Sequence, residues 1–384
     1  MAQDKQTVTP PAKKQWYETI SLRGYMQIRY NRLLETNDKL KCEQCDRSWG
    51  ESGGFAIRRG RIILSGNLTN NIYFYIQPDF GSSTGITQNI FQLRDAYVDV
   101  SFDKKNEFRL RIGQSKVPFG FENMQSSQNR LPLDRNDALN SAVSNERDMG
   151  AFFYWAPKTK REEYSGFIKD NLKGSGDYGV FAFGVYNGQT ANRAEQNKKL
   201  HIVSRISYPI KLGTQVIEPG IQGYVGKYVL PTDLRSTGVK ALKSFEFTDK
   251  RIAASFILYP KPFGIQAEYN IGKGPQYNPI TDSIEIRNLK GGYATFSCMI
   301  KGKQKDMVFY PYTRVQQYKG GKKHELDARS YDVKELEIGL EWQLNKNFEF
   351  TTAYTISKRR FEDSKQKNNL QSGNLLRLQA QLNF

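Results

Sequence analysis

LRLQAQLNF, residues 376–384, ends the chain, and its side chains alternate strictly between apolar and polar. The apolar residues are Leu376, Leu378, Ala380, Leu382 and Phe384, and the residues between them are Arg377, Gln379, Gln381 and Asn383. Successive side chains of a β-strand point to opposite faces. This stretch therefore predicts a strand with one apolar face and one polar face, and the chain ends on the apolar face with an aromatic residue.

The same period of two recurs along the whole chain. It predicts about sixteen strands, and an even number is typical of bacterial outer-membrane barrels. The predicted strands are 16–30, 55–69, 72–80, 90–102, 107–112, 149–157, 177–187, 198–209, 215–229, 246–259, 263–272, 290–300, 305–316, 331–344, 347–358 and 371–384. No segment of useful length has a helical period, and only 133–147 is expected to hold a helical turn or two.

The connections between these strands supply a second indication of a barrel. The short ones are 70–71, 103–107, 209–213, 259–264, 301–305 and 344–347. The long ones are 31–54, 81–89, 117–147, 188–197, 230–245, 273–289, 317–330 and 359–370. Alternation of short and long connections is typical of an outer-membrane barrel, with turns in the periplasm and loops outside the cell. The segment 158–176 is long where a short turn is expected, and the sequence gives no reason for it.

Composition excludes helical membrane spans but allows a barrel. The chain has 384 residues, of which 38% are hydrophobic and 13% aromatic. No window approaches the ~20 apolar residues of a membrane helix. In a barrel only alternate residues contact lipid, so polar composition is compatible with membrane insertion. The net charge of +18 fits nucleic acid, an anionic membrane or an anion-conducting lumen. Nucleic-acid binding leaves the strand register unexplained, and we do not expect it.

Enzyme chemistry is not expected. The chain has two histidines, His201 and His324, and neither has the spacing of a metal site or a catalytic triad. We predict no catalytic residue, no metal and no cofactor. Cys42 and Cys45 form a C-x-x-C with no second ligand pair nearby, and their simplest interpretation is a small disulfide loop of a secreted protein.

The polar start of the chain is interpreted as a mature N-terminus whose signal peptide has been removed. Residues 1–15 contain no apolar core of the kind found in signal peptides. We expect them to form a flexible periplasmic segment, and residues 16–384 to form one transmembrane barrel.

Several stretches resemble the phosphate-selective porin O/P family, in a Bacteroidetes-like branch. They are RRGRIILSGNL (58–68), YFYIQPDF (73–80), LRDAYVDVSF (93–102), RLRIGQSKVPFGFEN (109–123), ERDMGAFFYW (146–155) and YGVFAFGVYNG (178–188). The resemblance implies a sixteen-stranded barrel of the bacterial outer membrane that passes anions and is usually a homotrimer. It also implies that the third extracellular loop, here about 117–147, folds inward to narrow the pore. The terminal Phe384 is similar to the aromatic residue that ends many outer-membrane barrels.

The polar residues of the alternating strands are expected to face the lumen. The predicted pore-lining and anion-binding residues on the strands are Arg23, Arg29, Arg59, Arg61, Arg109, Arg111 and Arg377. Those at or in the third loop are Lys116, Arg130 and Arg135. Arginine suits phosphate because its planar guanidinium binds oxyanions through two hydrogen bonds. The alternative is that these charges are solvated or paired across strands. Inward glutamates on the late strands, Glu335, Glu337, Glu341 and Glu349, leave phosphate specificity open.

The sequence therefore predicts an all-β outer-membrane porin, a passive diffusion channel for small anions such as phosphate or polyphosphate. Its expected partners are small anions, the lipid and lipopolysaccharide of the outer membrane, and two further copies of the chain. The alternative is a barrel that serves as a structural or docking subunit of a larger outer-membrane complex, with protein partners and little or no channel activity.

Overall fold

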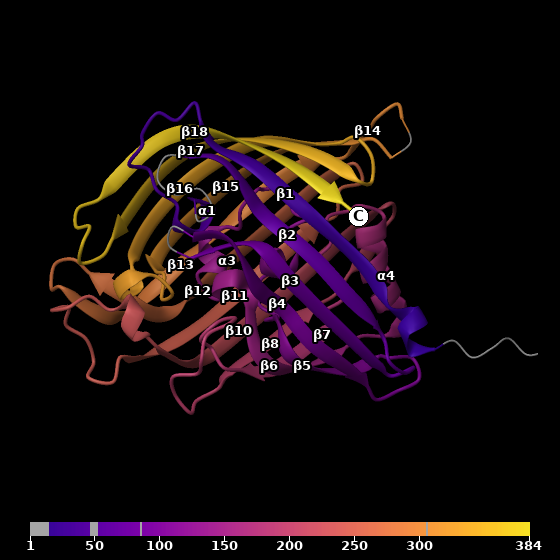
Figure 1. Ribbon diagram of the computed structural model, residues 1–384, viewed down its shortest axis with the longest axis horizontal. Coiled ribbons are helices and arrows are strands. Elements are labelled where there is room, and N and C mark those ends of the chain that lie inside the picture. The colour runs from indigo at the N-terminus through magenta and orange to yellow at the C-terminus, as the bar shows by residue number, and fades with distance from the viewer. Residues whose placement is uncertain (1–14, 47–52, 85–86, 305) are drawn as a thin grey trace, which may run out of the picture.

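The computed structural model describes residues 15–46, 53–84, 87–304 and 306–384, which form a closed antiparallel β-barrel (Figure 1). Its strands are β1 (Ser21–Leu33), β2 (Gly54–Asn67), β3 (Ile72–Thr84), β4 (Thr87–Ser101), β5 (Phe108–Lys116), β6 (Arg147–Trp155), β7 (Phe181–Tyr186), β8 (His201–Ser207), β9 (Ile210–Leu212), β10 (Gln215–Val229), β11 (Glu246–Leu258), β12 (Phe263–Asn278), β13 (Ser283–Cys298), β14 (Ile300–Lys301), β15 (Val308–Gly321), β16 (Ser330–Gln343), β17 (Phe348–Glu362) and β18 (Leu370–Asn383).

Sixteen strands cross the barrel, as the periodicity predicts. β9 continues β8 along the same partner, β10, and β14 continues β13 along β15. β1 pairs with β18 from Tyr25 opposite Asn383 to Leu33 opposite Leu376, which closes the barrel. The predicted flexible segment 1–15 lies outside the described residues except for Gln15.

The alternation of faces is confirmed on the terminal strand and on β5. On β18, Arg377 is 3% exposed whereas Leu382 is 41% exposed. On β5, Arg109 and Arg111 are buried inside the barrel, and Ile112 is 52% exposed on the outside. The outward apolar side chains form the surface that contacts lipid, because a barrel in a membrane places its apolar face outward.

Two long loops predicted from the sequence are shortened by strands that extend into them. β12 and β13 pair as far as Asn278 opposite Ser283, so the predicted loop 273–289 is a hairpin with a short turn. β15 likewise extends to Gly321, into the predicted loop 317–330. Beyond the membrane edge both faces of a strand contact water. The apolar–polar alternation then disappears although backbone pairing continues.

The prediction that no helix is present is wrong for the long segment between β6 and β7. Helix α4 (Lys158–Lys169) begins directly after Pro157 and buries only Tyr164 and Phe167. These two rings pack with Tyr259 of the barrel wall. One apolar turn among charged residues gave too weak a period to predict a helix. In the described part of the chain, no helix is long and apolar enough to cross a membrane.

The remaining helices are single turns in the connections. They are η1 (Trp16–Thr19), α1 (Glu43–Asp46), α2 (Phe121–Met124), α3 (Asp137–Asn140), η2 (Ser144–Glu146), η3 (Thr232–Leu234) and η4 (Leu326–Ala328). α3 and η2 confirm the helical turns expected in 133–147. Cys42 and Cys45 form the predicted disulfide, with their Cα atoms 5.1 Å apart.

Candidate ion pathway

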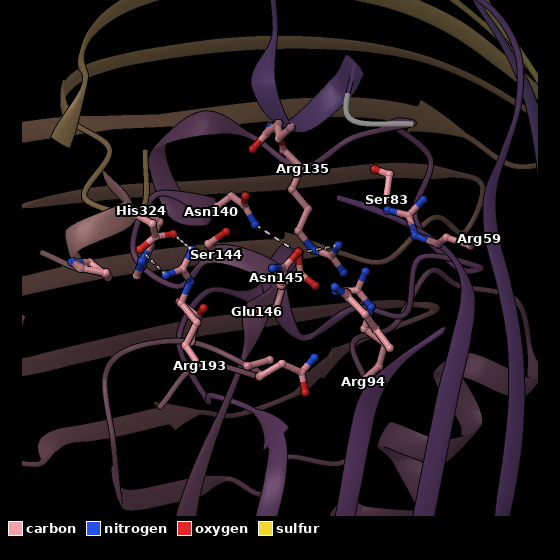
Figure 2. Close-up of a pocket in the computed structure, with 18 of the residues that line it drawn as sticks. Arg59, Ser83, Arg94, Arg135, Asn140, Ser144, Asn145, Glu146, Arg193 and His324 are labelled. Carbon is pink, nitrogen blue, oxygen red and sulfur yellow. Dashed lines mark hydrogen bonds and ion pairs between the residues drawn. The ribbon is translucent and has the colours of Figure 1, made fainter. Parts of the chain in front are cut away.

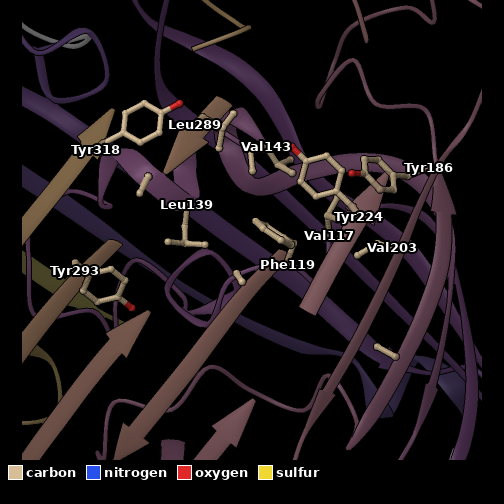
Figure 3. Close-up of a cluster of buried hydrophobic side chains, with 14 of the residues drawn as sticks. Val117, Phe119, Leu139, Val143, Tyr186, Val203, Tyr224, Leu289, Tyr293 and Tyr318 are labelled. Atoms are coloured by element: carbon tan, nitrogen blue, oxygen red, sulfur yellow. The ribbon is translucent and has the colours of Figure 1, made fainter. Parts of the chain in front are cut away.

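Residues 117–146, between β5 and β6, lie inside the barrel, and we call them the inner loop. Its apolar side chains, among them Phe119, Leu139 and Val143, pack against Tyr224 and Leu289 of the barrel wall (Figure 3). The segment folds inward because its sequence combines these apolar residues with charged residues that match charges on the wall. This segment occupies the chain position at which the family resemblance predicts the third loop.

Asp134 is the main ionic anchor of the inner loop. Its carboxylate binds Arg29 of β1 at 2.8 Å, Arg377 of β18 at 2.6 Å and Arg58 of β2 at 3.4 Å. Burial alone would raise the pKa of Asp134, but the three guanidinium groups hold this pKa well below its usual range. Asp134 is therefore ionised at neutral pH and ties the loop to the seam between the first and last strands.

Further anchors bind the inner loop to the opposite wall. Glu268 of β12 accepts hydrogen bonds from the backbone N–H groups of Phe121 and Glu122, at 2.6 and 2.9 Å. Asp137 binds Lys322 at 2.5 Å and Arg359 at 3.0 Å. The inner loop is therefore fixed mainly against β11 to β18. The lumen that stays open lies along the wall formed by β2 to β5.

Two hollows lie along that open wall. The extracellular vestibule has a volume of about 610 Å³ and is bordered by long connections such as 190–196 and 231–233. The periplasmic vestibule has a volume of about 520 Å³ and is bordered by the short turn at 70–71 and by α4. Glu146 lines the extracellular vestibule and Arg147 the periplasmic one, and they form an ion pair at 2.9 Å. One ion pair beside the inner loop therefore joins the lining of one hollow to the lining of the other.

The extracellular vestibule is lined by more cations than anions. Figure 2 shows Arg59 and Arg94 from the strands, and Arg135 from the inner loop, around this space. The cations are Arg58, Arg59, Arg61, Arg94, Arg135 and Arg193, and the carboxylates are Asp134, Glu146 and Asp233. Arg61 binds Asp79 at 2.8 Å and Arg135 binds Glu146 at 2.9 Å. Arg59 donates to the Gln27 side chain at 2.8 Å. No carboxylate of the described residues is within ion-pair distance of Arg59.

The periplasmic vestibule is also lined by more cations than anions. Its cations are Arg23, Arg109, Arg111, Lys116, Arg147, Arg161 and Lys169, and its carboxylates are Asp95, Asp99 and Asp177. Arg111 binds Asp99 at 2.7 Å, and Arg109 binds Asp177 at 2.8 Å. Within the described ranges, Arg23, Lys116 and Lys169 have no carboxylate partner. Together with Arg59 they are the four unpaired cations of the pathway.

The structure separates the predicted pore-lining residues into two groups. Those that line a vestibule are Arg23, Arg59, Arg61, Arg109, Arg111, Lys116 and Arg135. Arg29, Arg130 and Arg377 line neither vestibule, which corrects the prediction for them. Arg29 and Arg377 form ion pairs with Asp134. Arg130 donates to the backbone oxygens of Pro132 and Leu133, at 2.8 and 2.7 Å. Inward-facing arginines can serve as anchors as well as pore residues.

Sequence reasoning missed several vestibule residues, namely Arg94, Arg147, Arg161, Lys169 and Arg193. Arg94 faces inward beside Asp95 because the pairing of β3 with β4 shifts between Gln77 and Pro78. A bulge of this kind reverses the faces and is invisible to a strict period of two. Pro78 was the available signal, since proline within a strand often marks a bulge.

The inward glutamates also have partners that remove them from the pathway. Glu337 binds Arg377 at 2.9 Å, Glu341 binds Lys173 at 2.6 Å, and Glu335 binds Arg359 at 3.2 Å. Glu349 accepts a hydrogen bond from Asn383 at 2.9 Å. None of these four carboxylates lines either vestibule. Three of these four glutamates are therefore neutralised by a neighbouring cation, and Glu349 is held by an amide.

Comparison with solved structures shows the same fold at low identity. The outer-membrane channel DcaP of Acinetobacter baumannii is 13% identical, with a TM-score of 0.56 over 95% of this chain and 97% of that one. The anion-selective porin from Comamonas acidovorans is 12% identical, with a TM-score of 0.52 over 95% and 99%. OmpT of Vibrio cholerae, in its trimer form, is 9% identical, with a TM-score of 0.51 over 95% and 99%. No curated protein matches the chain.

The family model described as phosphate-selective porin O and P matches residues 37–384, which is most of the barrel. This match, the closed barrel and the inward third loop agree with one another. The chain belongs to the phosphate-selective porin O and P family and is a porin of the bacterial outer membrane.

Proposed function

We propose that this porin passes small anions, phosphate among them, by passive diffusion along the β2 to β5 wall. The observation that carries the proposal is the set of four unpaired cations, Arg59, Arg23, Lys116 and Lys169. Paired arginines contribute little net field, because each has a carboxylate beside it. The unpaired ones raise the local concentration of anions in a narrow, low-dielectric passage.

The arrangement supports a general preference for anions more than a single tight phosphate site. A phosphate site would need several unpaired donors converging on one point, since oxyanions are bound through multiple charge-assisted hydrogen bonds. The four unpaired cations are instead distributed over both vestibules. Weak binding at successive positions permits entry and release, as conduction requires. The name of the family and the anion selectivity in the name of the Comamonas porin agree with this proposal.

Ion selectivity in a planar bilayer tests the proposal. The purified protein is inserted into a lipopolysaccharide-free bilayer under a gradient of potassium chloride, and the reversal potential is measured. We expect the sign that corresponds to chloride carrying most of the current. Added phosphate is expected to reduce the chloride current without abolishing it. A reversal potential on the cation side would contradict anion preference.

A docking subunit with little channel activity remains a second candidate, and one observation favours it. α4 and the residues after it occupy the periplasmic mouth. Asn171 lies against Tyr310 at 2.5 Å, and the Lys173 backbone oxygen accepts from Gln125 of the inner loop at 2.5 Å. A silent channel that purifies with a partner in fixed stoichiometry would favour this candidate and overturn the transport proposal.

We also propose that the protein is a homotrimer. The support is the family, together with the trimer form named for the OmpT structure. Native mass in mild detergent tests this assembly. A mass of three chains is expected, and a single chain would contradict it.

A further inference from the structure

A row of outward-facing lysines crosses four adjacent strands of the barrel. The row consists of Lys250 on β11, Lys273 on β12, Lys290 on β13 and Lys319 on β15, all exposed. Lys250 lies directly opposite Lys273, and Lys290 lies directly opposite Lys319. Like charges placed directly opposite each other across strands are destabilising. The row therefore favours binding of anions from outside the chain.

Few carboxylates of the chain are available to neutralise this row. Over the residues that the structure describes, none of the four lysines has an ion pair. Asp332 of β16 is the cross-strand neighbour of Lys319. On the next strand pair, Lys334 and Lys358 again lie opposite each other. Positive charge thus exceeds negative charge along this line of the outer surface.

The lysine row marks the upper edge of the apolar surface. On β11 the outward residues Leu258, Phe256, Ala254 and Ile252 lead up to Lys250, and on β12 Ile265, Ala267, Tyr269 and Ile271 lead up to Lys273. At ~3.3 Å per residue and a tilt of about 40°, the path from Leu258 to Lys250 climbs about 20 Å. That height is close to the ~25 Å apolar band of outer-membrane barrels. The lysines therefore lie at the headgroup level on the side of the long loops.

A hollow lies on the outer surface directly beside the row. It has a volume of about 1180 Å³ and is lined by all four lysines together with Val225, Ile252, Ile271 and Ile286. These four apolar side chains are 42 to 52% exposed. A second hollow of about 1030 Å³ continues over β11 to β18, where Ala254, Ala267, Gly292 and Ala294 leave space between larger side chains. The surface thus combines cations at headgroup level with apolar recesses below them.

We propose that this face is a binding site for lipopolysaccharide, through its acylated, bis-phosphorylated disaccharide. The phosphates would bind the lysine row, and the acyl chains would lie in the apolar hollows. Basic clusters at membrane interfaces bind phosphorylated headgroups in this way. Three strand spacings separate Lys250 from Lys319, a width of about 14 Å. This width suits a disaccharide with a phosphate at each end better than a single phospholipid headgroup.

The site is confined to one half of the barrel. On β3, β4 and β6 the exposed outward residues toward the long-loop side include Phe80, Phe91 and Met149 in place of lysines. In the order of strands around the barrel, β6 is separated from β11 by β7, β8 and β10. A general attraction of a basic protein to anionic lipid would not produce this asymmetry. The lysine row is therefore the feature to test.

Native mass spectrometry of the purified porin with bis-phosphorylated lipid A tests the site. The first variant carries Lys250→Gln, Lys273→Gln, Lys290→Gln and Lys319→Gln. The matched control carries Lys104→Gln, Lys105→Gln, Lys301→Gln and Lys303→Gln, which are exposed lysines of the periplasmic turns. The site variant is expected to bind about 10- to 100-fold more weakly than the wild type, and the control to bind equally well. Equal binding by all three proteins, or equal loss in the control, would overturn the proposal.

Further variants, a second ligand and a conductance measurement keep the result interpretable. A variant with arginine at the same four positions retains the charges and is expected to bind lipid A, which separates charge from folding. If the glutamine variant does not fold, Lys290→Gln alone is expected to weaken binding about 3- to 10-fold.

Dephosphorylated lipid A is expected to bind wild type and site variant alike. A preference of the site variant for the phosphorylated form equal to that of wild type would contradict phosphate recognition. Conductance in a bilayer without lipopolysaccharide is expected to be unchanged, so this test is independent of the transport proposal.

Discussion

Arg111 illustrates how a lumenal arginine can be structural. Its guanidinium binds both oxygens of Asp99, at 2.7 and 2.9 Å, and lies 3.8 Å from the centre of the Tyr97 ring. The period of two placed Arg111 correctly on the inside of β5. It could not show that the neighbouring strand supplies a carboxylate and a ring that hold the side chain. The alternation therefore predicts which face of the strand an arginine occupies, but it does not predict whether the arginine is paired with a carboxylate.

Arg111→Leu is expected to destabilise the barrel by about 1–3 kcal/mol, because Asp99 loses its two-point partner while it remains buried. The nearest remaining cation, Arg109, is 3.9 Å from Asp99 and already binds Asp177. Urea unfolding in detergent micelles measures the change. Arg59→Leu is the matched control, since Arg59 has no carboxylate partner, and its effect is expected to be smaller. A larger cost for Arg59→Leu would contradict the distinction between paired and unpaired cations.

The anchors of the inner loop make a prediction about pH. The pKa values of Asp134 and Glu146 are held below their usual range by surrounding arginines, although burial opposes this. A lowered folded-state pKa gives stability that is fully present above the unfolded value of about 4 and is lost as pH falls through the folded value. Protonation of Asp134 and Glu146 is therefore expected to leave the single-channel conductance unchanged from pH 7 to about 4 and to raise it only in stronger acid.

Asp134→Asn serves as the comparison for that titration. It removes the charge that binds Arg29, Arg58 and Arg377, so the inner loop is expected to be looser and the conductance higher and noisier at neutral pH. A transition of the wild type between pH 5 and 7 that is absent from Asp134→Asn would contradict the assignment of Asp134 as an ionised anchor.

At the scale of elements, the strands could be predicted from sequence and α4 could not. A strand that spans the membrane contacts lipid on one face and water on the other. Its side chains therefore alternate between apolar and polar, as Leu110 and Arg111 do. α4 contacts the barrel wall through Tyr164 and Phe167, and its other residues are mostly polar. The hairpin extension of β12 and β13 was missed for a related reason, because no lipid contacts those residues. Where the chain extends beyond the lipid, the alternation of apolar and polar residues no longer predicts its secondary structure.

The candidate site shows the same limit. Arg59 could be predicted as lumenal because it follows the alternation on β2, whereas Lys116 could be predicted only from its place at the start of the third loop. Arg94 could not, because a bulge places it on the inner face. The pairing of Arg29 with Asp134 depends on the path of the inner loop, which joins residues 105 positions apart. No local pattern contains that information.

Removing the segment 158–176 is expected to enlarge the channel. A short turn would replace α4 and the residues that bind Glu341 and Gln343, while β6 and β7 keep their pairing. Because this segment lines and narrows the periplasmic vestibule, single-channel conductance is expected to increase. Lys173→Gln is the milder variant, which breaks one contact and leaves the helix in place. An unchanged conductance after the deletion would show that ions do not pass α4.

At the scale of the whole molecule, the two halves of the barrel differ in function. The inner loop packs against β11 to β18, and the open passage lies along β2 to β5. The outer surface of the β11 to β18 half carries the lysine row and the apolar hollows. The charge of +18 is thus divided between an inner passage and an outer band. We expect the lysine row on the outer surface to bind lipid headgroups, and the unpaired cations of the inner passage to attract anions.

The reversal potential of one triple variant tests most directly whether the unpaired cations cause anion preference. Arg23→Gln, Arg59→Gln and Lys169→Gln remove three of the four unpaired cations and leave Lys116 to hold the inner loop. The control carries Lys104→Gln, Lys301→Gln and Lys303→Gln, on the turns outside the passage. In a potassium chloride gradient, the triple variant is expected to lose more than half of the wild-type reversal potential, and the control to retain it. An unchanged reversal potential in the triple variant, or an equal loss in the control, would contradict the account.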